Sequence, residues 1–536
     1  MANGTDSLYF SPSSILTAGF QDSVVKVCIW LIPALIILRA ILKSRTSSRL
    51  PPGPPRLPII GHLHLLAPIP HQALYKLAVK YGPLYHIYLG NNPCVIISSP
   101  EMAKEFLKTN ELSCSNRPES MASEYLSYHS QDFSYAPYGP YWRFVKKLCM
   151  SELLSGQSLD FLHTVRRFEI ESMVKEMLQK ARAVEAVDVG GVITRITNNV
   201  ISNMIMSKRC SDTDDEAGEM RKMIKEISKL LGEFNPADYV WFYKFLDLQR
   251  IKKRLVDVRA RYDRLAQSII DERREIRKTQ EKIAADKDFL DLLLDVYEDE
   301  KAEFRLNMDK IKAIILDMFT TGTEAVANVT EWGLAELLNH PMIMDKARQE
   351  IDSVVGKSRL VQESDLVNLP YLQAIVKETL RLHAASPLIP RQASEDIVIG
   401  NYHIPAKTNV LVHDWAIGRD ETHWENALEF IPERFLKTSG ENGITGSAGH
   451  MDIRGQHYQL LPFGSGRRAC PGISLSLKVI QATIAAMIQC FEWNVQGEGN
   501  DSIPPVKMDE GRALVLERVH PLICIPVARL SPFPSI

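Results

Sequence analysis

One cysteine stands in surroundings that suit a thiolate metal ligand. Cys470 lies in the segment 463–472, shortly after the adjacent cations Arg467 and Arg468. The apolar spacing of residues 473–491 predicts a helix that begins just beyond this cysteine. A helix N-terminus and nearby guanidinium groups both favour negative charge, so both favour the thiolate over the thiol. The pattern therefore indicates a cysteine that binds a metal ion.

Three glycines in the same loop indicate that the metal belongs to a flat cofactor. Gly464, Gly466 and Gly472 carry no side chain, so the backbone can approach a planar ligand without collision. The implied ligand of the cysteine is haem iron. Residues 464–469 also match the dinucleotide-binding pattern G-x-G-x-x-A, but no βαβ unit with an acidic residue about 20 positions further on surrounds them. We therefore reject a nucleotide site in this loop.

The whole loop matches a family signature. Together with Phe463, Gly466, Arg468 and Gly472, Cys470 forms the pattern F-x-x-G-x-R-x-C-x-G. In this pattern the chain resembles the haem-thiolate monooxygenases of the cytochrome P450 superfamily, and the resemblance runs from residue 50 to the C-terminus. It implies a cytochrome P450 fold, mainly α-helical with small β-sheets, and haem b as the cofactor. It also implies O2 as a substrate and electrons from NADPH through a partner NADPH-cytochrome reductase.

A second motif matches the same family and predicts a structural network. Glu378 and Arg381 lie three residues apart, so on a helix they share one face and can pair. Far downstream, Arg434 lies in the segment Pro-Glu-Arg-Phe. The resemblance implies that this arginine joins the pair in a buried network, which supports the fold and has no catalytic role.

Haem carries two propionates that need cationic or hydrogen-bonding partners. The resemblance implies Trp142 and the basic residue four positions later, here Lys146, which offers a point charge in place of the bidentate fork of an arginine. It also implies Arg391 and Arg468. The complete set expected to contact the cofactor is Cys470, Trp142, Lys146, Arg391, Arg468, Phe463 and Gly464.

The helix expected to activate oxygen departs from the family pattern A/G-G-x-D/E-T-T. An apolar stripe predicts the helix, and its members are Ile311, Ile314, Ile315, Met318 and Phe319. Gly322 follows within the helix, at a cost of about 1 kcal/mol relative to alanine, and is expected to make room for the ligand. Glu324 matches the acid of the pattern, but Ala325 replaces the threonine that follows it.

The missing hydroxyl implies that proton delivery takes another route. We expect Glu324 and Thr323 to be the catalytic residues, with Thr321, ordered water or a substrate hydroxyl as alternative donors. A further alternative is that both threonines only bond backbone carbonyls. The missing threonine also permits a function of another class, an oxygen-independent haem-thiolate isomerase or dehydratase.

The N-terminal region predicts a membrane anchor. Residues 24–42 are almost wholly apolar, and these 19 residues span roughly 28 Å as a helix at about 1.5 Å per residue. Cations after the span predict that residues 1–23 are lumenal and that the large domain faces the cytosol. A basic, proline-rich hinge at 43–58 precedes a haem-thiolate catalytic domain at 59–536. We thus expect a single-pass protein of the endoplasmic reticulum membrane.

Charge and cysteine spacing bear on the partners and the compartment of the protein, and turn residues predict two β-hairpins. The net charge is -2 and the basic residues are dispersed, so nothing suggests a nucleic-acid partner. The eight cysteines show no disulfide-framework spacing, which favours a reducing compartment. Turn residues between short apolar runs predict two hairpins, one from 84–89 and 94–98 and one from 396–399 and 402–404.

Three segments resemble plant enzymes that oxidise flavonoids and isoflavonoids: 61–66, 147–156 and 453–458. The segment 508–514 looks more like the oleanane triterpene hydroxylases, and Pro390 stands where isoflavone synthases carry a lysine. We therefore expect a lipophilic plant specialised metabolite, a flavonoid or isoflavonoid first and an oleanane-type triterpenoid as the alternative, to be hydroxylated or desaturated. The expected pocket residues are Leu63, Met121, Ala122, Leu126, Ala384, Ala385, Leu388 and Ile389, under an aromatic roof at 234–245.

Overall fold

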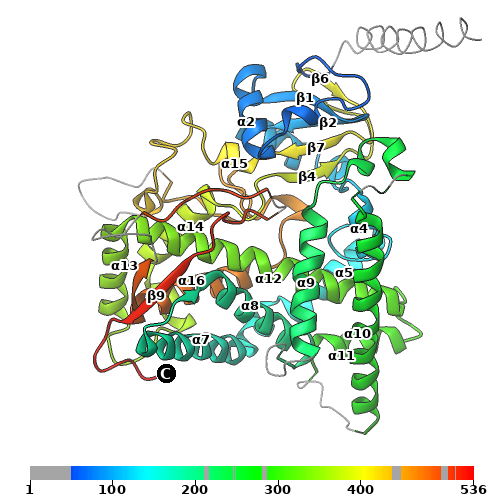
Figure 1. Cartoon of the computed structure of the whole chain (residues 1–536). Helices are drawn as coiled ribbons and strands as arrows, with labels where there is room; N and C mark the ends of the chain where they lie inside the picture. The colour runs from blue at the N-terminus through cyan, green and yellow to red at the C-terminus, as the bar shows by residue number, and fades with distance from the viewer. Residues whose placement is uncertain are drawn as a thin grey trace, which may run out of the picture.

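The computed structural model describes residues 50–209, 216–245, 247, 249–279, 287–436, 448–495, 505–512 and 515–536. The predicted lumenal tail, the membrane anchor and the first part of the hinge lie outside these residues. The described chain is mainly α-helical with small sheets, as predicted. Figure 1 shows α12 crossing the helical part of the molecule, with the sheet that contains β1 at one end.

The strands form three small sheets. A four-stranded sheet has the order β1-β2-β7-β4, with strands Leu84–Leu89, Asn92–Ile97, Asn409–Val412 and Ile389–Gln392. A three-stranded sheet has the order β3-β9-β8, with strands Val187–Asp188, Ile523–Ala528 and Phe491–Val495. The third pairs β5 (Ile397–Ile399) with β6 (Tyr402–Ile404). Both predicted hairpins are confirmed, because β1 pairs antiparallel with β2 and β5 with β6.

Helices make up most of the remaining structure. They are α2 (Pro70–Tyr81), α3 (Pro100–Lys104), α4 (Met121–Leu126), α5 (Pro140–Leu148), α6 (Gly156–Phe161), α7 (His163–Ala183), α8 (Val189–Met206), α9 (Glu216–Gly232), α10 (Ile251–Thr279), α11 (Phe289–Glu298), α12 (Met308–Asn339), α13 (Pro341–Val354), α14 (Pro370–Leu382), α15 (Asp414–Ile417) and α16 (Ile473–Cys490). The helix predicted at 473–491 is therefore confirmed as α16.

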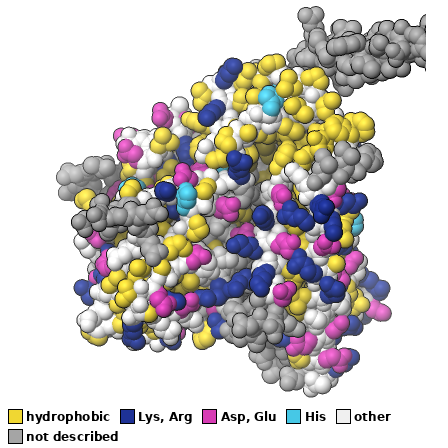
Figure 2. All heavy atoms as spheres, viewed as in Figure 1, with side chains coloured by type: hydrophobic (Ala, Val, Ile, Leu, Met, Phe, Trp, Pro, Cys, Tyr) yellow, Lys and Arg dark blue, Asp and Glu magenta, His cyan; other side chains and the backbone are white. Residues whose placement is uncertain are grey.

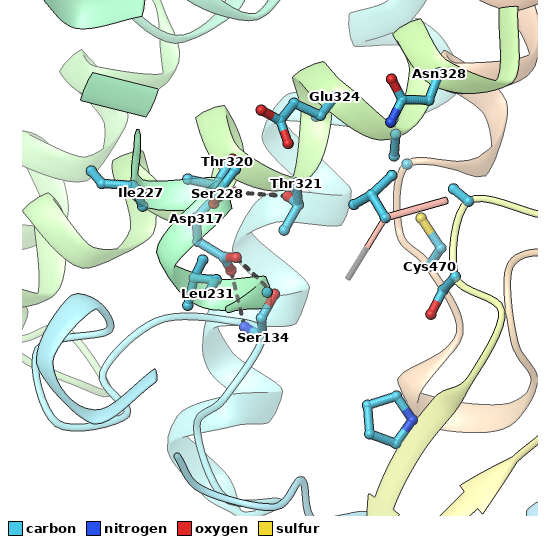
Figure 3. Close-up of a pocket in the computed structure, with 18 of the residues that line it drawn as sticks. Ser134, Ile227, Ser228, Leu231, Asp317, Thr320, Thr321, Glu324, Asn328 and Cys470 are labelled. Atoms are coloured by element: carbon cyan, nitrogen blue, oxygen red, sulfur yellow. Dashed lines mark hydrogen bonds between the residues drawn. The ribbon is translucent and has the colours of Figure 1, made fainter. Parts of the chain in front are cut away.

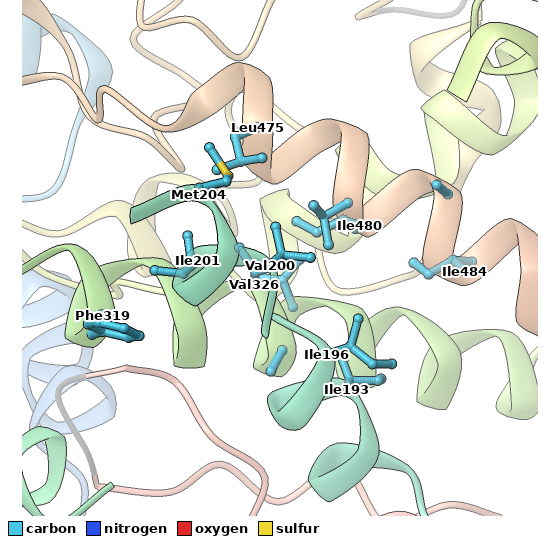
Figure 4. Packing of buried hydrophobic residues seen from close by; sticks show 14 of the residues in the cluster. Ile193, Ile196, Val200, Ile201, Met204, Phe319, Val326, Leu475, Ile480 and Ile484 are labelled. Carbon is cyan, nitrogen blue, oxygen red and sulfur yellow. The ribbon is translucent and has the colours of Figure 1, made fainter. Parts of the chain in front are cut away.

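The core is built where α8, α12 and α16 meet. Figure 4 shows Val200 of α8, Val326 of α12 and Ile480 of α16 packed together. Gly322 brings α8 and α12 close, because a Cβ at this position would lie 2.8 Å from Cδ1 of Ile201. A side chain at position 322 would therefore collide with α8, and the glycine also lines the cavity described below.

The helix that follows Cys470 is a central core helix. Among the described residues, α16 is the one helix long and apolar enough to pass as a membrane span, but 67% of its apolar window is buried in the protein. Its first turn begins after Gly472, and nearly all of its apolar side chains pack against other helices. This packing fixes the place of the loop that precedes it.

The predicted network around Glu378 is confirmed. Nε and Nη2 of Arg381 donate to the two carboxylate oxygens of Glu378 at 2.8 and 2.7 Å. Nε of Arg434 donates to the same carboxylate at 3.1 Å, and the backbone N–H of Ile431 donates to it at 2.9 Å. The side chains of Glu378 and Arg381 are fully buried, so this network joins α14 to the segment around residue 430 within the core.

The described part of the predicted hinge is attached to the domain. Nδ1 of His86 on β1 bonds the carbonyl oxygen of Pro51 at 2.5 Å, and the backbone N–H of His86 donates to Pro52 at 2.8 Å. His62 bonds the carbonyl of Pro54 at 3.0 Å. Proline has no backbone N–H but its carbonyl can accept a hydrogen bond. These bonds attach residues 51–54 to the domain next to β1.

Exposed hydrophobic side chains gather at the end of the molecule that carries β1 and β2, as Figure 2 shows. Leu57, Ile59 and Ile60 are exposed next to β1, and Phe234 and Trp241 are exposed after α9. The turn between β1 and β2 joins the two groups, because its backbone N–H groups donate to the carbonyls of Ile60 and Tyr239 at 3.2 and 3.4 Å. We call these five side chains the apolar end patch.

Candidate active site

A cavity of ≈ 1290 Å³ lies between α12 and the loop that carries Cys470. Further walls come from α8, α9, α16 and the segments 63–70 and 385–391. Of the predicted pocket residues, Leu63, Ala122, Leu126, Ala385 and Ile389 line this cavity. Met121, Ala384 and Leu388 do not. From the predicted aromatic roof, Phe234 and Tyr239 face the cavity, whereas Trp241 is largely exposed to solvent.

The cysteine loop is a tight turn that needs its glycines. Gly464 and Gly466 have φ values of +69° and +72°, a left-handed conformation that other residues rarely adopt. A Cβ on Gly466 would also lie 2.3 Å from a carboxylate oxygen of Glu111. The backbone N–H of Cys470 donates to the carbonyl of Phe463 at 2.9 Å and closes the loop. Phe463, Gly464 and Cys470 all line the cavity, as expected of a cofactor-binding loop.

The charges around Cys470 differ from those that the sequence indicated. Burial raises the pKa of the Cys470 thiol, while a hydrogen bond from the backbone of Gly472 and the charge of Arg117 lower it. Arg467 is instead half-exposed and donates to Tyr138 at 2.5 Å, and Arg468 donates to backbone carbonyls. The backbone N–H of Gly472 thus supplies the stabilisation of the thiolate that we predicted from the helix N-terminus. The arginine whose charge lowers the pKa of the thiol is Arg117.

Four guanidinium groups line the cavity, those of Arg117, Arg391, Arg468 and Arg512, and the charges of the first three act on one another. Burial lowers the pKa of Arg391, and the charges of Arg117 and Arg468 lower it further. Burial and Arg117 lower the pKa of Arg468 to about 9, against the opposing effect of Asp132 and Asp317. Nε of Arg117 has no hydrogen-bond partner among the described residues. A cluster of mutually repelling cations with an unsatisfied N–H fits an anionic group, and the two propionates of a haem whose iron binds Cys470 would supply it.

Two of the predicted propionate partners are directed elsewhere. The indole N–H of Trp142 donates to the carbonyl of Phe133 at 3.1 Å, and neither Trp142 nor Lys146 lines the cavity. The ammonium group of Lys146 donates to the carbonyl of Arg467 and lies 5.2 Å from the centre of the Trp142 ring. In this structure the indole and the ammonium group therefore support the cysteine loop from outside, and Arg117, which sequence reasoning missed, lines the cavity.

Thr323 does not face the cavity. Its side chain is 2% exposed, and its carbonyl accepts a hydrogen bond from Thr197 of α8 at 3.3 Å. Its own hydroxyl has no partner among the described residues. The reason is helical geometry: with 3.6 residues per turn, residue 323 points about 200° away from both 321 and 325. Thr321 and Ala325 line the cavity, so the proposed catalytic role of Thr323 has no geometric support.

Glu324 lines the cavity together with several other polar residues of α12, which Figure 3 shows on one side of the helix. Thr321 donates its hydroxyl proton to the carbonyl of Asp317 at 2.7 Å, so the predicted alternative of backbone bonding holds for this threonine. The carboxylate of Asp317 accepts two hydrogen bonds from Ser134, at 2.7 and 3.0 Å. Asn328 lies one turn after Glu324 and also faces the cavity.

Comparison with known proteins identifies this arrangement. The model of the family "Cytochrome P450" matches residues 51–524 of the chain. The chain belongs to the cytochrome P450 family. It is 47% identical to a 3,9-dihydroxypterocarpan 6A-monooxygenase of Glycine max, over 96% of this chain and 99% of that protein. It is 45% identical to a beta-amyrin 24-hydroxylase of the same plant, over 94% of this chain and 97% of that protein.

A solved structure supports the same fold. A zebrafish cytochrome P450 in a structure with abiraterone superposes with a TM-score of 0.70 at 25% identity, covering 86% of this chain and all of the other. As a cytochrome P450, the chain is a haem-thiolate monooxygenase with haem as its cofactor. The family implies O2, a lipophilic substrate and a reductase that supplies electrons from NADPH.

The acid on α12 of this cytochrome P450 titrates near neutral pH. Burial raises the pKa of Glu324 to about 7, and the charge of Glu517 adds to this effect. Ser228 and Lys225 of α9 lower it in part. Between pH 4.5 and about 7 the folded chain therefore holds a proton that the unfolded chain has released, so the effect of this group on stability becomes less favourable as pH rises through that window.

The titration of Glu324 predicts a pH dependence of coupling, measured as product formed per NADPH consumed. The carboxyl group donates a proton only when it is protonated, so coupling should fall as pH rises through about 7. Glu324→Gln has the same shape but no dissociable proton, and its coupling should be low and flat from about pH 6 to about pH 8. An inflection near neutral pH that persists in Glu324→Gln would assign it to a different group.

The arginine cluster predicts how tightly the cytochrome P450 holds its haem. Arg117→Leu removes one of three cations that face the propionates, and a hydrogen bond between charged groups contributes about 1.5–3 kcal/mol. Haem transfer to a scavenger protein should therefore be about 10- to 150-fold faster in Arg117→Leu. Arg143 is exposed and does not line the cavity, so Arg143→Leu is the matched control. Equal transfer rates in the two variants would contradict a role for Arg117 in haem binding.

Proposed function

We propose that this cytochrome P450 hydroxylates or desaturates a flavonoid or isoflavonoid. The observation that carries the proposal is the cavity wall formed by α12, which presents polar side chains at successive turns through Asp317, Thr321, Glu324 and Asn328. Such a wall suits a flat substrate with oxygen substituents along its length. The relative named for a pterocarpan 6A-monooxygenase, at 47% identity, supports this class of substrate.

The residues of the cavity divide the work in a defined way. When bound, haem supplies O2 activation and the transfer of one oxygen atom to the substrate. Cys470 would bind the iron, and Arg117, Arg391 and Arg468 would hold the propionates. Glu324 holds a proton on the cavity face of α12, and the apolar side chains on the opposing walls exclude water and orient the substrate.

An oleanane-type triterpenoid hydroxylase is the second candidate. The apolar side chains from segments 63–70 and 122–126 form a wall suited to a polycyclic hydrocarbon. The beta-amyrin 24-hydroxylase at 45% identity supports this candidate almost as well as the pterocarpan enzyme supports the first. For the first candidate, aryl migration is disfavoured as the reaction, because Pro390 lines the cavity at the position where isoflavone synthases carry a lysine.

One experiment separates the two candidates. The full chain is expressed in microsomes with a plant reductase and supplied in turn with flavanones, pterocarpans and β-amyrin. We expect NADPH-dependent products from the phenolic substrates that have gained one oxygen atom or lost two hydrogens. Turnover of β-amyrin alone would favour the second candidate, and products that form without NADPH would overturn the monooxygenase assignment.

We also propose that the chain is anchored in the endoplasmic reticulum membrane with its catalytic domain in the cytosol. The described chain begins at residue 50, within the predicted hinge, and the exposed side chains of Leu57, Ile59 and Ile60 shortly after it belong to the apolar end patch. This patch would rest on the same membrane surface. In sealed microsomes we expect added protease to digest the domain, whereas protection of the domain would reverse the orientation.

The reductase is proposed to dock near α5. Arg143 and Lys147 of α5 and Arg467 of the cysteine loop are exposed, and Lys146 joins α5 to this loop through the carbonyl of Arg467. Basic groups of this kind attract an acidic partner over a range limited by salt. The rate of reduction by the reductase should therefore fall as ionic strength rises.

A further inference from the structure

The face of α12 that lines the cavity has no hydroxyl group at position 325, where the family pattern places a threonine. Thr321, Ala325 and Asn328 follow one another at helical spacing and all line the cavity that Cys470 also lines. The middle position carries only a methyl group. A ligand held between Ala325 and Cys470 therefore receives no hydrogen bond from residue 325 itself.

The neighbouring threonines cannot replace that donor as they stand. A hydroxyl group has one proton, and Thr321 donates its proton to the carbonyl of Asp317. Thr320 likewise donates to the carbonyls of Leu316 and Asp317, at 3.0 and 3.2 Å. Thr323 faces α8. These three side chains thus present at most lone pairs to the cavity.

Asn328 has the free donors that the threonines lack. Its side chain lines the cavity, is partly buried, and makes no hydrogen bond with any described residue. A helical side chain tilts toward the N-terminus and covers the turn before its own Cα. The amide of Asn328 therefore reaches back over the turn that carries Ala325, as Figure 3 shows by its direction toward Glu324. The small side chain of Ala325 leaves space for this approach.

We propose that the Asn328 amide donates a hydrogen bond to the small oxygen-bearing ligand, O2 or the water that accompanies it, held between α12 and Cys470. The amide thereby takes the place of the absent threonine hydroxyl and positions that ligand beside the Glu324 carboxyl group, which lies one turn earlier on the same helix. The inference rests on the proposed haem-thiolate function of the cavity, and it adds a positioning residue outside the acid-threonine pattern of the family.

Carbon monoxide on the reduced haem of the full-length enzyme is the probe, because its vibrations report a hydrogen bond directly. Asn328→Leu keeps the shape of the side chain and removes its donors. In resonance Raman spectra we expect the C–O stretch to rise and the Fe–C stretch to fall in this variant. Peroxide released per NADPH consumed should rise by about two- to tenfold, the usual weight of one hydrogen bond.

Two further variants make the result specific. Thr330→Val is the matched control, because Thr330 is buried on the same helix, donates to the carbonyl of Val326 at 2.7 Å and does not line the cavity. It should leave both readouts unchanged. Adding Ala325→Thr to Asn328→Leu restores a hydroxyl one turn away and should recover the lower peroxide ratio.

The outcomes separate this inference from the proposed function. Unchanged carbon monoxide vibrations in Asn328→Leu, or equal changes in Thr330→Val, would overturn the role of Asn328 while the thiolate-type carbon monoxide spectrum still supports the haem site. A wild-type protein without that spectrum would overturn the proposed function itself. If only added substrate shifts the vibrations, and does so equally in both proteins, a substrate hydroxyl is the donor and Asn328 is not.

Discussion

Replacing Cys470 by serine should abolish the Soret band of the reduced carbon monoxide complex that marks thiolate ligation. A serine hydroxyl remains protonated at neutral pH and is a poor iron ligand, whereas a thiolate binds iron strongly. Oxygen-dependent turnover should fall by more than the 10- to 100-fold that typically follows loss of an outer partner of a metal ligand. The measurement is the carbon monoxide difference spectrum, with turnover assayed in the same membranes.

A second cysteine provides the control for this result. Cys94 is fully buried in β2 and does not line the cavity, so Cys94→Ala should keep the thiolate-type band. Haem bound through the three arginines alone would leave Cys470→Ser with a spectrum typical of non-thiolate ligation. A thiolate-type band in Cys470→Ser would show that another residue is the ligand.

Glu378→Gln should destabilise the protein by about 3 to 5 kcal/mol. The carboxylate is fully buried between Arg381 and Arg434, and its neutral replacement leaves two buried guanidinium groups without a counter-charge. We expect a large drop in the denaturant midpoint of the haem-loaded protein and a low yield of folded chain. Glu378, Arg381 and Arg434 do not line the cavity, so the carbon monoxide spectrum of the folded fraction should stay normal.

An exposed ion pair in the same protein provides the control for the stability change expected in Glu378→Gln. Glu185 pairs with Lys180, and their side chains are 55% and 42% exposed. Glu185→Gln should change stability by less than about 1 kcal/mol, because water screens such a pair. If the two variants unfolded at the same denaturant concentration, the buried network would not be a major source of stability.

Much of the framework could be predicted because the signals were local. The loop glycines, the helix after Cys470 and the two hairpins each follow from residue types within a short segment. The Glu378 network required residues far apart in sequence, and the family resemblance supplied the connection to Arg434. Local chemistry and resemblance together gave the fold class and the side chain expected to hold the iron.

The details of the cavity depended on packing that the sequence does not express. Residues 320–323 are all small or polar, so no apolar periodicity shows which of them faces the cavity, and only the placement of α12 within the fold turns Thr323 away from it. Arg117 lies in an irregular segment before α4, and only long-range contacts bring it beside Arg391 and Arg468. Trp142 belongs to a recognisable motif, but its indole N–H donates to the carbonyl of Phe133.

The walls of the cavity differ in how freely they can change during evolution. α12, which carries Glu324, and α16, which follows Cys470, share one tightly packed core, so substitutions there would shift the reacting groups relative to each other. The facing wall comes from α9, where Ser228 and Leu231 point into the cavity. Buried side chains of α9, such as Leu230, belong to the same core, whereas Ser228 and Leu231 are only partly buried and can vary with less effect on it. Related enzymes can thus acquire new substrates, phenolic or terpenoid, through substitutions of cavity-facing residues on α9. The reacting groups positioned by α12 and α16 stay in place.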